Sequence, residues 1–512
     1  MDFSKIKKIY MIGVKGVGMT MLAEYLAAQT GLRQGCGGQG GIKVEGSDTE
    51  EKFMTDEVLK KAGVKVIEHF DKKNIPAGAD LIVYSTAYSA ENNPEVVAAL
   101  AGRIKVLTYA EALAEVFNQK YGIAVIGSHG KTTTTAWLGY VLEKAGLAPS
   151  VMVGSRVPQF NGLSIAGKSN YLVVELDEYQ NKIKYFNPRA VLLSNIDYDH
   201  PDFFKTKADY ENVFIEFIKK IPLSGFLVAN WDDPIIRKVA RVNCRGKIIT
   251  YAINEAADFV AYNIRQEKNP PCPLPARASQ RQAGPLIKGA SGWQYFKVKM
   301  ADEDENAEFL GDFSIQLAGR HNIANALAVI AACVELGVGL FEIRKYLEEF
   351  AGTARRMEVL GEFRGATIID DYAHHPTEIK ATLAGARQLY PKNKLIVVFH
   401  PHTFTRTKAL LNDFAKSFGE ADEVIVLDIY GSAREEQGGV HSADLVREIK
   451  NQKPARNASL IEAGGSKIKN IKYIPTLASC EKYLRKNAGR GDVILLMGAG
   501  DVFRIGEKLV KN

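Results

Sequence analysis

The chain has 512 residues, of which 46% are hydrophobic and 24% charged, and its formal net charge is +7. This length suits about three domains of ~150 residues, and the composition is ordinary for a globular protein. Lysine and arginine are scattered along the chain, so we expect no nucleic-acid partner.

Cysteine usage argues against a disulfide-rich or zinc-stabilised protein, and hydropathy argues against a membrane protein. The five cysteines are Cys36, Cys244, Cys272, Cys333 and Cys480. They are widely spaced and contain no C-x-x-C pair, which argues against a disulfide framework and a structural zinc site. The first residues show no apolar leader with a cleavage site. No run approaches ~18 apolar residues, so no membrane span is expected. These features predict a cytoplasmic protein.

The first 120 residues alternate short β-branched runs with helical patterns. Strands are expected at 9–12 and 81–84, and helices at 17–28 and 109–117. This alternation predicts a parallel sheet with crossover helices. Residues 31–41 contain six glycines and are expected to form a mobile loop.

Two more units of the same kind follow. The second has expected strands at 123–126, 171–174 and 190–193, and the proline-rich residues 264–292 are interpreted as a surface excursion from it. The third begins near Ala354, with expected strands at 367–369, 395–399, 423–427 and 493–496. The pattern predicts an α/β protein with domains at 1–120, 121–352 and 353–512.

Residues 127–134 read GSHGKTTT, between an apolar strand and the start of a helix. Gly127 and Gly130 let backbone N–H groups turn around phosphate oxygens, and the helix N-terminus adds partial positive charge. Lys131 can reach the β- and γ-phosphates, and the Thr132 hydroxyl suits Mg²⁺. The spacing is shorter than G-x-x-x-x-G-K-[ST]. A glycine turn that caps a helix is the alternative, but the preceding strand and the four threonines favour a phosphate loop.

Acidic residues follow the next two strands of this unit. Glu175, Asp177 and Glu178 come after the strand at 171–174, and Asp199-His200 comes after the strand at 190–193. Mg²⁺ prefers oxygen ligands, so Glu175 is a natural ligand and His200 a less usual one. Each cluster alone is more often a solvated strand end. Together, beside a phosphate loop, they favour a metal site.

With these motifs the chain resembles the Mur ligase family over nearly its whole length, apart from the glycine-rich and proline-rich segments. The matching runs are 127–134, 175–178, 199–200, 319–325, 355–356, 370–376, 401–407 and 498–501. The resemblance implies three domains: a Rossmann-like UDP-binding domain, a central P-loop ATPase-type α/β domain and a C-terminal Rossmann-like α/β domain.

The resemblance also implies a reaction. The chain is most similar to the family member that joins L-alanine to UDP-N-acetylmuramate through an acyl phosphate, with ATP and Mg²⁺, in peptidoglycan precursor synthesis. Residues 178–181, EYQN, are instead similar to the member that attaches an intact tripeptide, L-Ala-γ-D-Glu-diaminopimelate, to the same nucleotide sugar. We expect a monomer or homodimer.

Site residues are implied by the same resemblance. The ATP set comprises Gly127, Ser128, His129, Gly130, Lys131, Thr132, Thr133, His321, Asn322, Asn325, Arg356 and Asp370. The metal ligands are Thr132, Glu175 and His200. The amino-acid site comprises Tyr372, His374, His375 and Arg406, because a guanidinium can bind a carboxylate with two parallel hydrogen bonds. Catalytic roles are expected for Lys131, His200, His374 and Arg356, and the general base is left open.

Residues 13–19 read GVKGVGM and resemble the dinucleotide fingerprint G-x-G-x-x-G, with Lys15 at the second glycine. This lysine weighs against an NAD(H)-dependent oxidoreductase. The family resemblance instead places a UDP-sugar pyrophosphate here, with Lys15 adding charge. The expected contacts are Gly16, Val17, Gly18, Met19, Asp48, Ser85 and Thr86. A nucleotide-sugar-binding protein switched by ATP is the alternative from another class.

Overall fold

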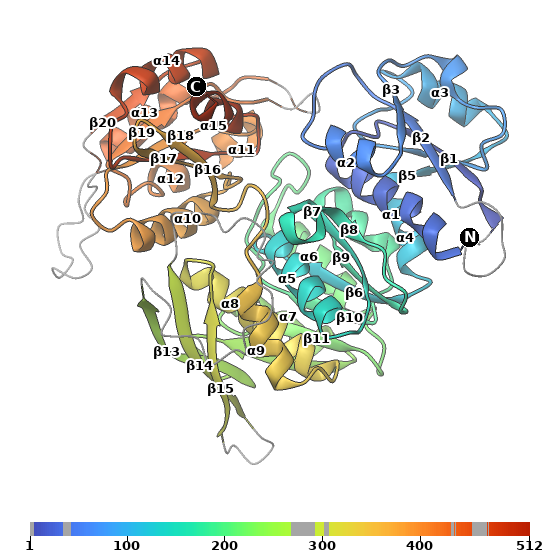
Figure 1. The fold of residues 1–512 in the computed structure, drawn as a ribbon, viewed down its shortest axis with the longest axis horizontal. Helices are drawn as coiled ribbons and strands as arrows, with labels where there is room; N and C mark the ends of the chain where they lie inside the picture. Colours follow the sequence, from blue (N-terminus) through green and yellow to red (C-terminus); the bar gives the residue numbers. More distant parts are fainter. Residues whose placement is uncertain are drawn as a thin grey trace, which may run out of the picture.

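The computed structural model describes residues 5–33, 42–267, 292–301, 307–431, 435, 437–452, 468 and 470–511. It contains three sheets, of five, ten and six strands, in chain order. Each sheet is covered by helices, as expected for an α/β protein with three domains (Figure 1).

The N-terminal sheet is wholly parallel and has the order β3-β2-β1-β4-β5. Its strands are β1 (Lys8–Ile12), β2 (Lys43–Ser47), β3 (Lys65–Ile67), β4 (Leu81–Tyr84) and β5 (Lys105–Thr108). Its helices are α1 (Val17–Arg33), α2 (Asp56–Lys61), α3 (Pro94–Ala101) and α4 (Tyr109–Phe117). The strand order reverses at β1, and ligands of open α/β sheets bind beyond the carboxyl ends of strands at such a point.

The central sheet has the order β15-β14-β13-β12-β11-β10-β6-β9-β7-β8. Its strands are β6 (Tyr121–Ile126), β7 (Ser150–Val157), β8 (Gly162–Ile165), β9 (Tyr171–Glu175), β10 (Ala190–Leu193), β11 (Phe226–Asn230), β12 (Lys247–Ala252), β13 (Phe259–Glu267), β14 (Trp293–Ala301) and β15 (Ala307–Ile315). The helices are α5 (Lys131–Lys144), α6 (Lys207–Ile218), α7 (Pro234–Asn243), α8 (Arg320–Glu335) and α9 (Leu340–Glu349). Strand β6 lies between β9 and β10, parallel to both. The acidic residues that follow β9 and β10 therefore flank the phosphate loop.

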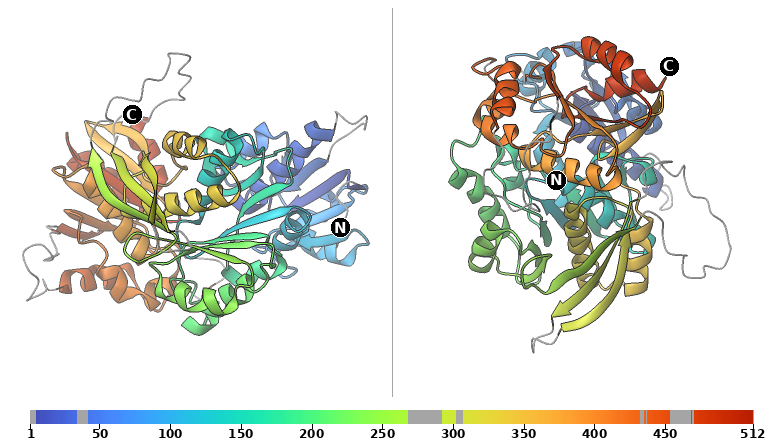
Figure 2. Two further views of the ribbon diagram at one scale, coloured as in Figure 1. Left: turned by 90° about the horizontal axis from the view of Figure 1, so that it is seen from below. Right: turned by 90° about the vertical axis from the view of Figure 1, so that its left-hand side faces the viewer.

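Strands β13–β15 pair antiparallel and project from the central domain on the side away from the N-terminal domain (Figure 2). The two ends of the expected excursion at 264–292 border this region. Residues 264–267 still belong to β13, which the sequence pattern missed, and β14 starts at Trp293. Residues 268–291 lie outside the described residues.

The C-terminal sheet has the order β16-β17-β21-β18-β19-β20, with only β16 antiparallel to its neighbour. Its strands are β16 (Glu358–Phe363), β17 (Ala366–Asp371), β18 (Leu395–Phe399), β19 (Glu423–Val426), β20 (Asn470–Tyr473) and β21 (Val493–Met497). Its helices are α10 (Pro376–Leu389), α11 (Phe404–Ala409), α12 (Leu411–Ala415), α13 (Ser442–Asn451), α14 (Leu477–Asn487) and α15 (Phe503–Val510).

The N-terminal and C-terminal domains lie on either side of one end of the central domain (Figure 1). On one side, the Glu24 carboxylate of α1 accepts hydrogen bonds from Leu163 N–H and Ser164 Oγ, each at 2.9 Å. Arg504 of α15 donates to the Lys52 carbonyl at 3.3 Å, which joins the two outer domains. These contacts join the N-terminal domain to the central domain and to the C-terminal domain.

Most expected elements are present with bounds shifted by a few residues, but one further detail differs. Helix α1 continues to Arg33, so 31–33 are helical where a glycine-rich loop was expected, and residues 34–41 lie outside the described part. The boundaries at 120/121 and 352/353 stay predictions. Within the described part of the chain, no helix is long and apolar enough to span a membrane.

Candidate active site where the domains meet

The phosphate loop follows the buried strand β6 and needs glycine at two positions. Gly127 has φ +130° and Gly130 has φ +81°, both unfavourable for side chains. A Cβ on Gly127 would lie 2.3 Å from Ser194 Oγ, and one on Gly130 would lie 2.7 Å from Asn325 Oδ1. The loop then enters α5, whose first N–H groups have no acceptor within the helix and favour an anion.

Lys131 is held across the loop by backbone and carboxylate oxygens. Its Nζ donates to the Gly127 carbonyl at 2.5 Å and to Glu178 Oε2 at 3.1 Å. Burial lowers the pKa of Lys131, but the negative charges of Glu178, Asp177 and Glu175 outweigh burial and raise the pKa to about 12. Lys131 is therefore a permanent cation at the mouth of the loop.

Two of the three predicted metal ligands lie in contact. Thr132 Oγ1 donates to Glu175 Oε1 at 2.8 Å, and the other carboxylate oxygen of Glu175 accepts from Gly154 N–H at 2.7 Å. A hydroxyl and a carboxylate are hard oxygen donors, so the chemistry of this pair fits Mg²⁺.

His200, the third predicted ligand, belongs to a neighbouring cluster. Its donor atom and those of Asp177 and Glu178 lie within 4.8 Å of one another. The backbone of His200 has φ +56°, and its ring packs on Tyr179 with centroids 4.6 Å apart. Asp177 and Glu178 were not among the predicted ligands, although they follow Glu175 after a single residue, Leu176. The carboxylates of this cluster also suit a hard cation.

A cavity of about 370 Å³ lies between the N-terminal and central domains. It is lined on one side by residues that follow β4, including the predicted Thr86, and on the other by Tyr179, Gln180, Asp202 and Phe203. Tyr179 donates to Asp202 Oδ2 at 2.7 Å. The cavity therefore leads from the predicted UDP-sugar side towards the acidic clusters.

The predicted adenine residues begin α8 and lie against the phosphate loop. Asn322 Nδ2 donates to the Ala318 carbonyl at 2.6 Å, and Asn325 Nδ2 donates to Asn322 Oδ1 at 3.2 Å. Both asparagines are buried, whereas His321 is exposed. In this structure the amide groups fix the helix start beside Gly130, and an adenine contact stays a prediction.

Two adjacent arginines of the C-terminal domain have different surroundings. Arg355 donates to Asp370 Oδ2 at 3.0 Å and to the Gly498 carbonyl at 2.8 Å, inside the domain. Asp370 is 1% exposed, and burial raises the pKa of its carboxyl to about 6 despite Arg355. Arg356 instead ion-pairs with Glu378 at 3.5 Å and lies over the Tyr372 ring. Of the predicted pair Arg356 and Asp370, only Arg356 is positioned towards α10.

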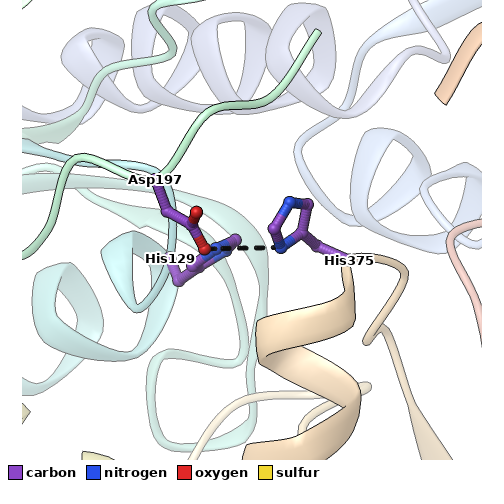
Figure 3. Close-up of side chains that lie close together, drawn as sticks. All are labelled: His129, Asp197 and His375. Atoms are coloured by element: carbon purple, nitrogen blue, oxygen red, sulfur yellow. Dashed lines mark hydrogen bonds and ion pairs between the residues drawn. The ribbon is translucent and has the colours of Figure 1, made fainter. Parts of the chain in front are cut away.

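Three side chains from two domains point towards one another in Figure 3: His129 of the phosphate loop, Asp197 after β10, and His375 at the start of α10. Asp197 Oδ2 lies 3.0 Å from His129 Nε2 and 3.6 Å from His375 Nδ1. Thr377 Oγ1 also donates to this oxygen, at 2.6 Å. Asp197 therefore ties the central domain to α10, a role that the sequence did not indicate.

The charge state of His129 follows from these contacts. Burial lowers the pKa of His129, but Asp197 and Glu378 outweigh burial and raise it to about 9. The ring is therefore an imidazolium at neutral pH, which disfavours a metal ion on this group of three. His375 has the opposite tendency, since burial and the charge of His129 lower its pKa. Its Nε2 is buried without a hydrogen-bond partner among the described residues.

The predicted carboxylate-binding Arg406 is engaged with the protein. Its Nε and Nη2 donate to the two carboxylate oxygens of Asp199 at 2.7 and 3.2 Å, across the domain boundary. Both side chains are buried, at 4% and 7% exposure. The structure thus shows the expected two-pronged bond, but with a carboxylate of the chain.

At the N-terminal sheet, the prediction that Lys15 adds positive charge to the pyrophosphate site is wrong. The Lys15 side chain turns away from the glycine turn, is 1% exposed, and donates to the carbonyls of Thr49 and Glu51 and to Glu68 Oε1, at 2.8 to 2.9 Å. The fingerprint fixes the backbone but not the direction of this side chain. Asp48 accepts from Lys15 N–H at 2.7 Å and from Tyr88 at 3.2 Å.

The other predicted UDP-sugar contacts surround the same turn. Gly16, Gly18, Ser85 and Thr86 are half-buried, and Val17 is 44% exposed. Met19 is 2% exposed and packs in the core, so any contact that it makes with a ligand is through its backbone. A Cβ on Gly18 would lie 2.7 Å from the Tyr109 ring, which explains the glycine there.

Family models match three consecutive parts of the chain. Residues 8–121 match "Mur ligase family, catalytic domain", residues 125–333 match "Mur ligase middle domain", and residues 355–500 match "Mur ligase, glutamate ligase domain". Two curated proteins named UDP-N-acetylmuramate–L-alanine ligase are each 36% identical to the chain. The one from Desulfitobacterium hafniense covers 98% of this chain, the one from Caldanaerobacter subterraneus covers 100%, and 99% of each relative is matched. The chain belongs to the Mur ligase family.

Solved structures show the same fold. The UDP-N-acetylmuramate–alanine ligase of Thermotoga maritima has a TM-score of 0.73 at 23% identity, with 98% of both chains covered. A murein peptide ligase from Psychrobacter arcticus has a TM-score of 0.68 at 24% identity, covering 99% of this chain and 98% of its own. These structures confirm the three-domain α/β architecture.

Proposed function

We propose that this protein joins L-alanine to the lactyl carboxylate of UDP-N-acetylmuramate, with ATP converted to ADP and phosphate. The observation that carries the proposal is that the phosphate loop meets the histidine-rich start of α10, from another domain, through His129 and Asp197. A phosphoryl donor and an acceptor amine can thus be held at one place. The printed names of full-length relatives at 36% identity support the choice of substrates.

ATP is proposed to bind with its phosphates on residues 127–133 and its base near His321, Asn322 and Asn325. The N–H groups at the start of α5 are available for phosphate oxygens, and Lys131 is a fixed cation beside them. Thr132, Glu175 and His200 are the proposed ligands of Mg²⁺, joined by Asp177 and Glu178 on the geometry of the second cluster. When bound, Mg²⁺ offsets the charge of the phosphates.

The nucleotide sugar is proposed to bind at the carboxyl end of β1, near Gly16, Val17, Gly18, Met19, Asp48, Ser85 and Thr86. The cavity beside Thr86 continues towards Tyr179 and the acidic clusters. A nucleotide sugar in this position extends its carboxylate towards the phosphate loop. This direction brings the two reacting groups together.

In the first step, a carboxylate oxygen attacks the γ-phosphorus and ADP leaves, which gives an acyl phosphate. The attack brings an anion towards an anion, so catalysis depends on positioning and on positive charge. Lys131 supplies this charge from the loop, and Arg356 supplies it from the C-terminal domain, in contact with the Tyr372 ring. Both arginine and lysine are held by carboxylates, so neither needs to reorganise during the step.

In the second step, the amine attacks the acyl carbon, the C–O bond to phosphate breaks, and the proton lost by the amine leaves with phosphate. Tyr372, His374, His375 and Arg406 are proposed to receive the amino acid. His375 Nε2 is a buried polar atom of this region that has no hydrogen-bond partner within the part of the chain that the structure describes. Arg406 already binds the Asp199 carboxylate with two hydrogen bonds, which supports its assignment to this task.

A second candidate is the ligase that attaches an intact tripeptide to UDP-N-acetylmuramate. The run EYQN at 178–181 favours this candidate. Gln180 and Asn181 have φ of 59° and 53°, and Gln180 lines the cavity between the domains. The murein peptide ligase with a TM-score of 0.68 has the same fold but does not decide between the acceptors.

The test is ADP release with UDP-N-acetylmuramate and, in turn, L-alanine, glycine, L-serine and the tripeptide. The proposal expects the highest kcat/KM with L-alanine and no sustained ADP formation without an amine. Turnover with the tripeptide alone would replace the proposal by the second candidate. ADP formation that is independent of every amine would indicate an ATP-switched binding protein, and NAD(H) binding would indicate an oxidoreductase.

A further inference from the structure

Glu378, in the first turn of α10, is the residue on which three predicted site residues converge. The residues are His129 of the phosphate loop, Arg356 before β16 and His374 before α10. Their nitrogen atoms lie 3.4, 3.5 and 3.2 Å from the Glu378 carboxylate oxygens. Glu378 is buried, at 9% exposure. The sequence interpretation did not select it.

Glu378 and the Tyr372 carbonyl together determine which ring nitrogen of His374 is free. Glu378 Oε2 accepts from the His374 backbone N–H at 3.0 Å and lies 3.2 Å from its Nδ1. The Tyr372 carbonyl lies 2.9 Å from the same Nδ1. A carbonyl and a carboxylate only accept hydrogen bonds, so Nδ1 carries the hydrogen. Nε2, on the other side of the ring, is therefore a hydrogen-bond acceptor.

His374 is also uncharged at neutral pH. Burial lowers the pKa of its ring to about 4, more than Glu378 raises it. A neutral ring whose Nε2 accepts can receive the N–H of an attacking amine and direct the nitrogen lone pair towards an acyl carbon. The opposite tautomer would present a hydrogen to the amine and would turn the lone pair away.

The contact with His129 reaches the other domain. His129 Nδ1 faces Glu378 and its Nε2 faces Asp197, so the imidazolium joins a carboxylate of the C-terminal domain to one of the central domain. Burial raises the pKa of the Glu378 carboxyl, but His374, His129 and Arg356 outweigh burial and hold it well below the usual range. Glu378 is therefore an anion at neutral pH.

We infer that Glu378 is a positioning residue that couples the amine site to the phosphate loop: with the Tyr372 carbonyl it fixes the tautomer of His374, it holds Arg356, and it binds His129 only when α10 is docked on the central domain. The inference rests on the proposed function for its second reactant, the amine. The carboxylate itself touches neither phosphate nor amine. It acts through the three side chains that it holds.

The test compares Glu378→Gln and Glu378→Asp with the wild type, and uses Glu423→Gln as a matched control. Glu423, the first residue of β19, is also a buried carboxylate of the same domain; it pairs with Lys394, just before β18, and with Lys472 of β20, and none of these residues belongs to the first turn of α10. Its substitution measures the general effect of neutralising a buried carboxylate. Thermal unfolding establishes that each variant is folded.

Two readouts separate positioning from a purely structural role. The first readout compares the two steps of the reaction: acyl phosphate is trapped with hydroxylamine in the absence of L-alanine, and amide formation is measured with L-alanine. We expect Glu378→Gln to lower amide formation about 100-fold, and to lower hydroxamate formation less, since the amine step alone needs His374. Glu378→Asp should recover part of the loss, and Glu423→Gln should stay within threefold of the wild type.

The second readout is the titration of His129, followed by NMR with labelled histidine and assigned by the loss of a signal in His129→Gln. The groups that face this ring are Asp197, His375 and Glu378. We expect Glu378→Gln to lower the pKa of His129 from about 9, because one of its two carboxylates is gone. An unchanged titration, or amide formation within threefold of the wild type, would overturn the inference.

The two readouts fail independently. If the wild-type protein makes no amide from UDP-N-acetylmuramate and L-alanine, the proposed function fails, whereas the titration of His129 still reports whether Glu378 joins the two domains. If the wild type makes the amide and Glu378→Gln does so equally well, only the inference about Glu378 fails.

Discussion

Arg406 of α11 and Asp199 of the central domain form a buried, two-pronged ion pair across the domain boundary, at 2.7 and 3.2 Å. Asp199 precedes His200, a proposed metal ligand, and Arg406 lies in the proposed amino-acid site. The pair therefore connects these two parts of the site in the arrangement of domains seen here. If Arg406 receives the amino acid as proposed, the carboxylate of the amino acid competes with Asp199 for the same guanidinium.

Replacement of this guanidinium by an ammonium should separate charge from geometry. Arg406→Lys keeps the charge but loses the planar pair of donors, and leaves Asp199 incompletely paired, which costs about 2–5 kcal/mol at a buried interface. We expect kcat/KM for L-alanine to fall at least 30-fold and the radius of gyration in solution scattering to increase. Lys408→Arg, on the exposed side of the same helix, is the control. Unchanged kinetics and scattering would contradict the role of the pair.

Gly130→Ala tests the phosphate loop. The new Cβ would lie 2.7 Å from Asn325 Oδ1 at a residue with φ +81°, so we expect KM for ATP to rise at least tenfold. Gly146→Ala is a matched control, because Gly146 has φ +86° and open space around its Cβ position. It carries the backbone strain of about 1–2 kcal/mol without the contact. Equal effects of both substitutions on KM would show that the loop contact is irrelevant.

Lys131→Met removes the cation that the loop holds beside Glu178. Because charge neutralisation is the main contribution to phosphoryl transfer, ADP formation should fall about 1,000-fold or more. Lys144→Met, at the other, exposed end of α5, should have no effect on the rate. The measurement is ADP release at saturating substrates, with thermal unfolding as the check of folding. A rate within tenfold of the wild type would mean that Lys131 does not face the phosphates.

The raised pKa of His129 predicts a pH dependence of stability. In the folded protein the pKa is about 9, above its value of ~6.5 in an unfolded chain. The folded state therefore binds more protons between these values, and the stabilisation, up to about 3 kcal/mol, is complete below pH 6.5 and lost as the pH rises to 9. The unfolding temperature of the wild type should thus decline more steeply over this pH range than the unfolding temperature of His129→Gln. Parallel curves would show that His129 is uncharged.

Much of the fold was predictable because it depends on local sequence patterns. Strands such as β10 and β18 are continuous apolar runs, and the phosphate loop and the acidic run at 175–178 directly follow such strands. Parallel strands bring their carboxyl ends to one edge, so these motifs meet without further information.

The remaining features depend on contacts between distant segments. Asp197 meets His375, and Glu378 meets His129, from different domains, and neither acid lies in a metal-ligand or nucleophile spacing, so no local pattern selects them. Lys15 was misjudged because a fingerprint determines backbone conformation, whereas its side chain follows the carbonyls of Thr49 and Glu51. The antiparallel strands β13–β15 border segments with little hydrophobic periodicity.

The central claim is that the phosphate loop activates the carboxylate of a nucleotide sugar for attack by L-alanine. Its most direct test is mass spectrometry of the product formed by the wild-type protein with ATP, Mg²⁺, UDP-N-acetylmuramate carrying ¹⁸O in its carboxylate, and L-alanine. The claim predicts UDP-N-acetylmuramoyl-L-alanine and transfer of one ¹⁸O atom to the released phosphate. Amide without ¹⁸O in phosphate, or ADP without amide, would contradict it.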